Sequence, residues 1–252
     1  MFPDSKKILI LDSVDSTNNY AMALIRKEKS TGVKAVFAME QTHGKGRNGK
    51  HWKSNKGDNI ILSIPRQMQW LTVSQQFQLS VAVALGCYDL IIKYVPENIF
   101  IKWPNDVFIN DSKAGGILIE NIIKGTLWQW TVIGIGLNIN QEEFDDFNLK
   151  ATSLKRCTKK TYHVLQLAEE LHSFVLQRME DLKSGNFLNM LKEYNHHLFA
   201  RNKVVRLKKQ NIVFETKIEG VSESGQLITK DILERRFNFD EVEFKGIVDG
   251  SQ

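Results

Sequence analysis

The spacing of apolar residues divides the chain into a long first part with strands and helices and a short last part with strands alone. In the first part, short apolar runs that end in turn-forming residues predict strands, and apolar residues three or four positions apart predict helices. The predicted strands cover residues 7–14, 33–39, 59–64, 98–103, 107–109, 116–123 and 127–139. The predicted helices cover residues 16–25, 77–88, 167–182 and 187–198.

The pattern changes after Arg201. Four short apolar stretches, separated by the turn signals Glu219-Gly220 and Ser224-Gly225, predict strands at residues 203–207, 214–221, 226–229 and 236–244. Four or five short strands in about fifty residues are typical of a small closed barrel. No repeat or low-complexity linker marks a boundary, so the change of periodicity alone predicts two domains, residues 1–199 and 200–252.

Composition and charge narrow the picture only slightly. The 252 residues suffice for a sizeable core, and the net charge of +5 favours anionic partners such as nucleotides, nucleic acids or acidic proteins. Cys87 and Cys157 lie far apart, which argues against a disulfide framework and a structural zinc site. Met1–Lys7 lacks the apolar run of a signal peptide, and the apolar stretch Leu79–Leu85 is too short to span a membrane. We therefore expect a cytoplasmic protein without a membrane anchor.

Residues 44–49 form a glycine-rich loop with the spacing GxGxxG after a predicted strand. A dinucleotide-binding fingerprint would continue into a helix, whereas residues 50–59 have no apolar periodicity, which argues against that reading. Glycine lets backbone amides approach an oxyanion, and five cations follow His43, at positions 45, 47, 50, 53 and 56. Phosphate binding and a solvated surface loop both stay open on this segment alone.

Two further segments combine charged residues with unusual backbone. In Lys102-Trp103-Pro104-Asn105-Asp106 the proline stiffens a break between strands, and the amide and carboxylate can hold Mg²⁺ directly or through water. Lys113 precedes two glycines at the start of a strand, and its ammonium suits a carboxylate or a phosphate. Each segment can equally be an ordinary turn. Gly134 and Gly136 lie in an apolar strand, where a ligand or another backbone can pass closely.

Taken together, these segments resemble the biotin–protein ligase family from about Ile8 to Asn140. The five matching motifs, in order, are Ser16-Thr17-Asn18; Gln41 with residues 44–52; residues 102–106; residues 113–118; and residues 134–138. The resemblance implies an α+β fold, with a mixed β-sheet catalytic domain flanked by helices and a small C-terminal SH3-like β-barrel. It also implies an enzyme that activates biotin with Mg·ATP to biotinyl-5′-AMP. The biotin would then pass to a lysine of a biotin carboxyl carrier domain, in acetyl-CoA carboxylase or a related carboxylase.

The resemblance also assigns roles to individual residues. Lys113 and Arg47 would be catalytic, because two anions must approach each other in the first step. The expected biotin-binding residues are Ser16, Thr17, Asn18, Gln41, Gly44, Lys45, Arg47, Lys113, Gly116, Gly134 and Gly136. The expected ATP-binding residues are Arg47, Asn48, Lys50, Trp52, Lys102, Asn105 and Asn138, and the expected Mg²⁺ ligands are Asn105 and Asp106, directly or through water.

Two features depart from the fullest form of the family. Lys45 stands where the family loop commonly has an arginine, and lysine lacks the planar fork of a guanidinium. No helix-turn-helix pattern precedes Ile8, so we expect no sequence-specific DNA binding. The sequence leaves open the acceptor protein, the order of substrate binding, the role of the C-terminal barrel, and whether the chain forms a homodimer.

Two rival functions stay open. A lipoate or octanoate ligase shares the adenylation chemistry, although its substrate tail has no ureido group for Ser16, Thr17 and Gln41 to bind. A non-catalytic nucleotide- or RNA-binding protein fits the positive charge, but the last part of the chain has few aromatic residues spaced for base stacking. The pairs His196-His197 and His43/His51 lack the spacing of zinc ligands.

Overall fold

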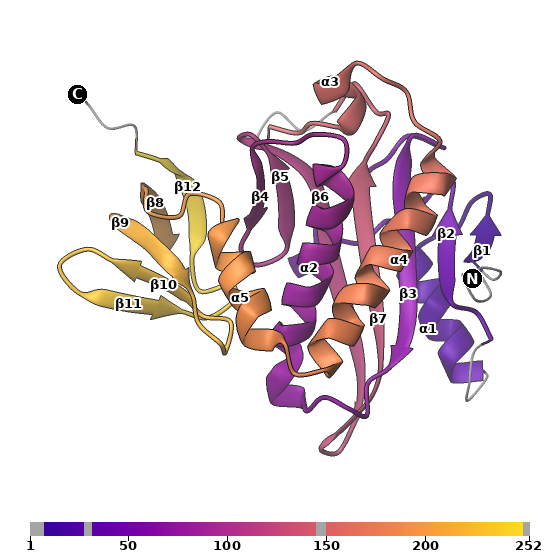
Figure 1. Cartoon of the computed structure of the whole chain (residues 1–252), viewed down its shortest axis with the longest axis horizontal. Helices are drawn as coiled ribbons and strands as arrows, with labels where there is room; N and C mark the ends of the chain where they lie inside the picture. The colour runs from indigo at the N-terminus through magenta and orange to yellow at the C-terminus, as the bar shows by residue number, and fades with distance from the viewer. Residues whose placement is uncertain (1–7, 28–31, 145–149, 249–252) are drawn as a thin grey trace.

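The computed structural model describes residues 8–27, 32–144 and 150–248, so Met1–Lys7 lies outside the described residues. Its centre is a seven-stranded sheet in the order β1-β2-β3-β7-β6-β5-β4 (Figure 1). The strands are β1 Ile8–Leu11, β2 Ala35–Ala38, β3 Asn59–Gln67, β4 Ile99–Lys102, β5 Asp106–Ile109, β6 Ser112–Lys124 and β7 Leu127–Asn138. Because β1 and β2 are parallel and the remaining neighbours antiparallel, the sheet is mixed, as expected.

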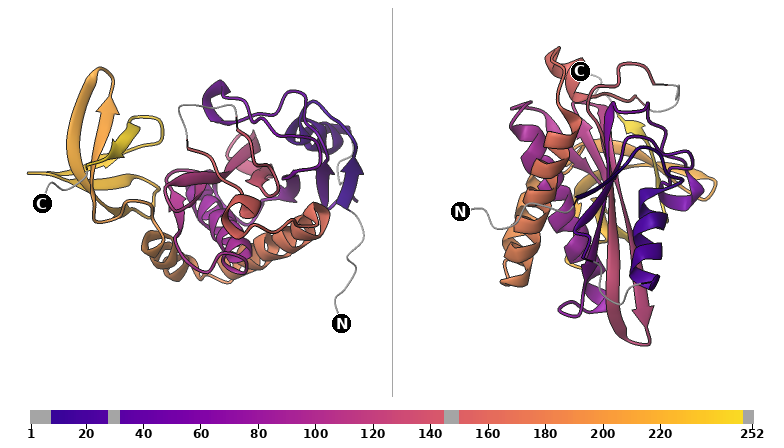
Figure 2. Two further views of the ribbon diagram at one scale, coloured as in Figure 1. Left: turned by 90° about the horizontal axis from the view of Figure 1, so that it is seen from above. Right: turned by 90° about the vertical axis from the view of Figure 1, so that its right-hand side faces the viewer.

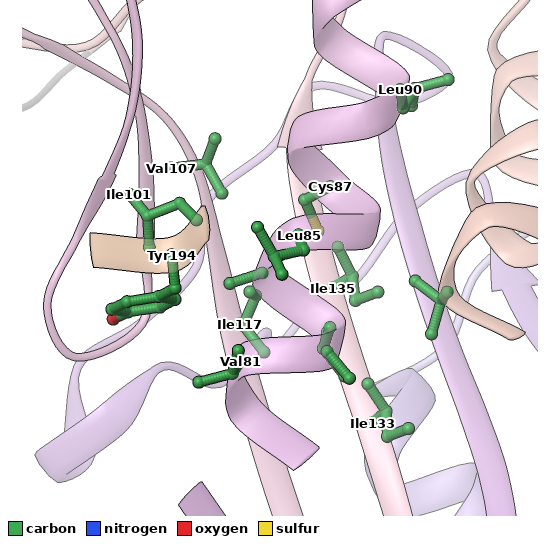
Figure 3. Packing of buried hydrophobic residues seen from close by; sticks show 14 of the residues in the cluster. Val81, Leu85, Cys87, Leu90, Ile101, Val107, Ile117, Ile133, Ile135 and Tyr194 are labelled. Carbon is green, nitrogen blue, oxygen red and sulfur yellow. The ribbon is translucent and has the colours of Figure 1, made fainter. Parts of the chain in front are cut away.

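Helices cover both faces of this sheet, so the sheet lies between two helical layers (Figure 2, right). The helices are α1 Thr17–Lys27, α2 Gln76–Ile92, α3 Leu154–Thr158, α4 Val164–Lys183 and α5 Phe187–His196. Helix α2 is apolar nearly all round, which is typical of a helix buried between other elements. Its residues Val81, Leu85 and Leu90 pack with Ile117 and Ile135 of the sheet in the main core (Figure 3).

Gly86 brings α2 and α4 close together. A Cβ at this position would lie 3.0 Å from the Cα atom of Val175, closer than real Cβ contacts allow comfortably. Glycine therefore lets the two helix backbones approach closely at this point, and the two helices form one tightly packed layer.

The opposite face of the sheet is only partly covered. Ala21 and Ile25 of α1 pack against Val36 and Val132 in a second, smaller core. Because side chains alternate along a strand, Gly134 and Gly136 share this face with Val132 but extend beyond the residues under α1. The strip above these glycines is where the candidate site lies.

A second, five-stranded antiparallel sheet follows, in the order β11-β10-β9-β8-β12. Its strands are β8 Val204–Lys209, β9 Ile212–Val221, β10 Leu227–Lys230, β11 Glu234–Phe237 and β12 Glu243–Ile247. The predicted single strand at 236–244 is wrong: residues 238–242 separate two strands that lie on opposite edges of the sheet. The small C-terminal β-structure is present, but its hydrogen-bonded order is open where a closed barrel was expected. The boundary between residues 199 and 200 stays a prediction.

The structure contains a short α-helix that the sequence did not predict. The single-turn helix α3, whose N-cap Ser153 accepts a hydrogen bond from the backbone of Arg156 at 3.1 Å, has no counterpart among the predicted helices. The predicted strand at 127–139 is present as β7, and its central residues Thr131, Val132 and Ile133 are all buried beneath the two helical layers.

Among the described residues, no helix combines the length and apolar composition needed to cross a membrane.

Candidate active site

A cleft of about 1890 Å³ lies over three glycines, Gly116 of β6 and Gly134 and Gly136 of β7, which are called the glycine strip. The start of α1, residues 41–55, the turn after β4 and the C-terminal sheet contribute its other walls. Every residue that the sequence singled out for biotin, ATP or Mg²⁺ lines this cleft. Segments far apart in the chain therefore meet in one place, as the five motifs predicted.

The floor of the cleft beside α1 is a network of small polar groups. The backbone and hydroxyl of Thr17 both donate to Gln41 Oε1, at 2.8 and 3.0 Å. Ser63 Oγ lies 2.8 Å from Thr17 Oγ1 and 2.6 Å from Asn18 Oδ1. Ser16 is buried and takes the predicted N-cap position, directly before the first residue of α1. Such closely spaced hydroxyl and amide groups suit a ligand that both donates and accepts hydrogen bonds.

Asn18 is fixed against the sheet through both ends of its amide. Its nitrogen donates to Glu120 Oε2 at 2.7 Å, and its oxygen lies beside Gly134. A Cβ at position 134 would lie 2.4 Å from that oxygen, so only glycine leaves room for Asn18. Gly134 thus serves the polar floor indirectly.

Replacing Gly134 with alanine is expected to displace Asn18 and disturb the polar floor. Overpacking of this kind lowers the free energy of unfolding by about 1–3 kcal/mol. Urea unfolding measures the effect. Gly32→Ala is the matched control, because no atom lies within 4 Å of its Cβ position; equal behaviour of the two variants would contradict the role of Gly134.

The glycine-rich loop folds back on itself above the strip. The backbone of Trp52 donates to the carbonyl of Gly44 at 2.9 Å, and a Cβ at Gly44 would lie 2.4 Å from the carbonyl oxygen of Trp52. Asn48 and Gly49 adopt left-handed φ angles of 54° and 73°, which asparagine and glycine tolerate best. Residues 47–49 form only a 3₁₀ turn, so no helix follows the GxGxxG pattern and the dinucleotide-binding reading fails.

Trp52 lies directly over the glycine strip. A Cβ at Gly136 would lie 2.5 Å from the Trp52 ring, and one at Gly116 would touch the same ring at 3.5 Å. The indole Nε1 is buried and has no hydrogen-bond partner among the described residues. A buried donor without a partner in a cleft is a natural site for a ligand acceptor.

Two lysines reach the same region from different strands. Lys113 Nζ forms an ion pair with Asp106 Oδ1 at 2.7 Å, with both side chains 23% exposed. Lys102 Nζ lies over the rings of Phe108, Phe199 and Phe244, at 4.8, 5.8 and 4.4 Å from their centroids. Burial among these rings lowers the pKa of Lys102 from its ordinary value. Both ammonium groups therefore add positive potential to the cleft.

The predicted Mg²⁺ ligands fit a metal that is shared with phosphates. Asn105 Nδ2 donates to the carbonyl of Ile117 at 2.8 Å, which leaves the amide oxygen as a ligand atom. Asp106 uses one carboxylate oxygen on Lys113 and keeps the other. Mg²⁺ commonly takes one or two protein oxygens and completes its shell with water and substrate phosphates, so this pair suffices. The described residues contain no cluster of three acidic, histidine or cysteine side chains that would hold a metal by itself.

Arg47 and Asn48 are held by a residue that the sequence did not single out. Arg47 Nη2 forms an ion pair with Asp240 Oδ2 at 3.0 Å, and Asn48 Nδ2 donates to Asp240 Oδ1 at 2.8 Å. Asp240 belongs to the turn between β11 and β12, and it lines the cleft. Ser63 and Glu120 were also missed, because no local motif marks a serine or glutamate inside a strand.

The remaining predicted residues have mixed surroundings. Lys45 Nζ donates to Asn19 Oδ1 of α1, so its ammonium is engaged away from Arg47. Lys50 closes the loop turn through its backbone, which accepts from Gly46 at 2.7 Å. Asn138 is only 6% exposed and donates to the carbonyl of Thr152 at 3.0 Å. Its position indicates support for the cleft wall, and its contact with ATP stays a prediction.

Comparisons with known proteins identify a family and several relatives of this chain. Residues 10–138 match the model of the biotin/lipoate A/B protein ligase family. The bifunctional ligase/repressor BirA of Bacillus spizizenii is 27% identical over 225 residues, covering 88% of this chain and 68% of that protein. The biotin–[acetyl-CoA-carboxylase] ligase of Paracoccus denitrificans is 35% identical over 132 residues, covering 52% of this chain and 53% of that protein.

A solved structure gives the same result for the fold. The biotin protein ligase from Aquifex aeolicus in complex with biotin and ATP superposes with a TM-score of 0.80, over 96% of this chain and 99% of that one, at 22% identity. Because the family model covers more than half of the sequence, including all five motifs, the chain belongs to the biotin/lipoate A/B protein ligase family.

Proposed function

We propose that the protein is an ATP-dependent biotin–protein ligase. The observation that carries the proposal is the convergence of three parts in one cleft. These parts are the polar residues Ser16, Thr17 and Gln41, the cations Arg47 and Lys113, and the three glycines at positions 116, 134 and 136, all of which line the cleft. The similar proteins from Paracoccus denitrificans, Mycobacterium tuberculosis and Homo sapiens are named as biotin ligases, which supports the same activity.

In the first step, a carboxylate oxygen of biotin attacks the α-phosphorus of ATP, pyrophosphate leaves, and biotinyl-5′-AMP forms. Both reactants are anions, so cations that neutralise their charge lower the barrier more than a general base would. Lys113 would contact the biotin carboxylate and the α-phosphate oxygens, and Arg47 would hold the phosphates through its planar fork. Mg²⁺ on Asn105 and Asp106 would neutralise charge on the departing pyrophosphate.

In the second step, the neutral amine of a carrier lysine attacks the carbonyl carbon of the mixed anhydride, and AMP leaves with the bonding electron pair. The amine gives up a proton to the surrounding solvent. Water can attack the same carbonyl, so the intermediate requires a cover. Trp52 and the glycine-rich loop lie directly above the strip and would form that cover.

The acceptor class follows from the relatives: we propose the biotin carboxyl carrier domain of acetyl-CoA carboxylase or a related carboxylase. A cytoplasmic location and the lack of sequence-specific DNA binding stay predictions. An electrophoretic shift on operator DNA that depends on sequence and salt would overturn the second of these. Dimer formation stays open.

Lipoate or octanoate transfer is the second candidate, because the family description includes lipoate ligases. An aliphatic tail with a dithiolane or methyl end has no hydrogen-bonding group to match Ser16, Thr17 and Gln41, which line the cleft. A ligand that forms hydrogen bonds with these polar residues gains affinity that an aliphatic tail does not, so the polar lining favours biotin.

Pyrophosphate–ATP exchange, measured with biotin, with lipoate and without any acid, tests the proposal. We expect exchange that requires biotin, followed by transfer to a carrier domain and loss of transfer when the acceptor lysine is changed to arginine. Exchange with lipoate alone would move the assignment to the second candidate. Folded protein that binds ATP but supports exchange with neither acid would favour the nucleotide-binding reading.

A further inference from the structure

The turn between β11 and β12 places a carboxylate on the glycine-rich loop. The two oxygens of Asp240 contact two neighbouring residues, Arg47 at 3.0 Å and Asn48 at 2.8 Å, although 192 residues separate Asn48 from Asp240. These two contacts therefore join the C-terminal sheet to the loop that covers the cleft. Asp240 has a left-handed φ angle of 67°, which is rare outside glycine, asparagine and aspartate.

The turn is held firmly in this position. Phe239 lies under the Arg47 guanidinium at 5.2 Å and packs against Trp103, with the ring centroids 5.5 Å apart. Asn238 is tied to Glu241, whose carboxylate accepts from the Asn238 backbone at 3.3 Å and side chain at 3.0 Å. The Trp103 indole in turn donates to the carbonyl of Gly225 at 2.9 Å. The carboxylate of Asp240 is thus presented to the loop by a supported element.

The contact has the chemistry of a phosphate site. A guanidinium fork and an amide N–H bind a carboxylate and a phosphate through the same donors. Arg47 and Asn48 are the two loop residues expected to hold ATP, and here both of their donors face Asp240. The side chains of Arg47 and Asp240 remain 26% and 49% exposed, so an incoming phosphate can reach the pair and compete for it.

We infer that Asp240 occupies the phosphate-binding donors of Arg47 and Asn48 until the nucleotide displaces it. This inference deepens the proposed function and rests on it. Asp240 is then a positioning residue: it keeps Arg47 and Asn48 at the cleft in the empty enzyme and weakens the affinity for ATP. Nucleotide binding releases the Asp240 carboxylate from Arg47 and Asn48, so the contact between the glycine-rich loop and the C-terminal sheet depends on the phosphates.

Asp240→Asn is the first test, because it removes the negative charge and asparagine tolerates a positive φ angle. We expect the KM for ATP in biotin-dependent exchange to fall roughly two- to fivefold, as expected for loss of a partly exposed ionic competitor. The kcat of exchange and the KM for biotin should change less than twofold. Asp240→Gly also suits the backbone, lacks the carboxylate and should give the same shift, so the test does not depend on one variant.

Asp231→Asn is the matched control for net charge. Asp231 is in the neighbouring hairpin of the same sheet and pairs with Arg235 at 3.0 Å, away from the loop. Its variant should keep the wild-type KM for ATP. In an Arg47→Ala background, Asp240→Asn should change the affinity for ATP less than in the wild type, because only the contact with Asn48 remains to be released.

Equilibrium dialysis measures ATP binding without biotin. It therefore tests the role of Asp240 separately from the proposed ligase activity. Wild-type protein without biotin-dependent exchange would overturn the proposed function, while dialysis still measures the Asp240 effect. Exchange in the wild type with an unchanged or raised KM for ATP in both Asp240 variants would overturn the role of Asp240. An equal shift in Asp231→Asn would also overturn it, since the cause would then be net charge alone.

Discussion

Lys113→Ala is expected to lower biotin-dependent pyrophosphate–ATP exchange by roughly 100- to 1000-fold, the range typical for losing one preorganised group that stabilises charge in a transition state. Lys113 and Gly116 line the cleft side by side. The Lys113 Nζ would lie 3.5 Å from a Cβ placed on Gly116. The loss should fall mainly on kcat, because the charge develops as the two anions meet. Quenched-flow measurement of biotinyl-5′-AMP formation reports this step directly.

Two controls accompany the Lys113 variant. Lys124→Ala removes an exposed lysine from the far end of the same strand and should exchange like the wild type. The thermal midpoint of Lys113→Ala should stay within a few degrees of the wild type, since a partly exposed ion pair contributes roughly 0–1 kcal/mol. Near-normal exchange by a folded Lys113→Ala protein would remove Lys113 from the mechanism.

Arg47→Gly is expected to loosen the adenylate after it forms. Charge-assisted hydrogen bonds contribute roughly 1.5–3 kcal/mol, so losing those of Arg47 should speed release of biotinyl-5′-AMP by roughly ten- to 100-fold. Released intermediate acylates any accessible lysine. Labelling of a bystander protein without a carrier domain, followed by avidin blot, measures the escape.

Lys56→Gly provides the comparison within the same part of the chain. Lys56 pairs with Asp12 at 2.6 Å, outside the phosphate-binding donors, and its loss should leave labelling restricted to the carrier domain. Arg47→Lys keeps the charge without the fork and should show intermediate escape. If Arg47→Gly labels only the carrier domain, retention of the adenylate does not depend on Arg47.

The long elements of the fold could be predicted because burial leaves a periodic record in the sequence. The apolar series through Val81 and Leu85 indicates α2, and the alternation of Trp128, Trp130 and Val132 with the residues between them indicates β7. Helix α3 has a single turn and leaves no such record. Strands β11 and β12 were merged, since the apolar residues Phe237 and Phe244 frame a turn without glycine or proline.

Site residues that belong to local sequence motifs could be predicted. Residues that only strand pairing or a tertiary contact brings to the site could not. Lys113 and Arg47 belong to recognisable segments with glycines beside them. Ser63 supports Thr17 and Asn18 from beneath the cleft only because β3 pairs with β7 so that Ser63 lies opposite Gly134. Asp240 reaches the site through the contact of the turn between β11 and β12 with the glycine-rich loop, which no short-range spacing encodes.

The close approach of α2 and α4 at Gly86 should determine which amide protons exchange slowest with solvent. Amide protons in tightly packed helices exchange with solvent only when the whole structure opens, whereas those of exposed loops exchange through small local openings. Leu85 and Val175 should therefore keep their protons far longer than Arg47 and Asn48. Ligand binding should slow exchange in the loop, and it should also slow exchange in the helical layer, because a ligand that binds only the folded protein raises the free energy of global unfolding.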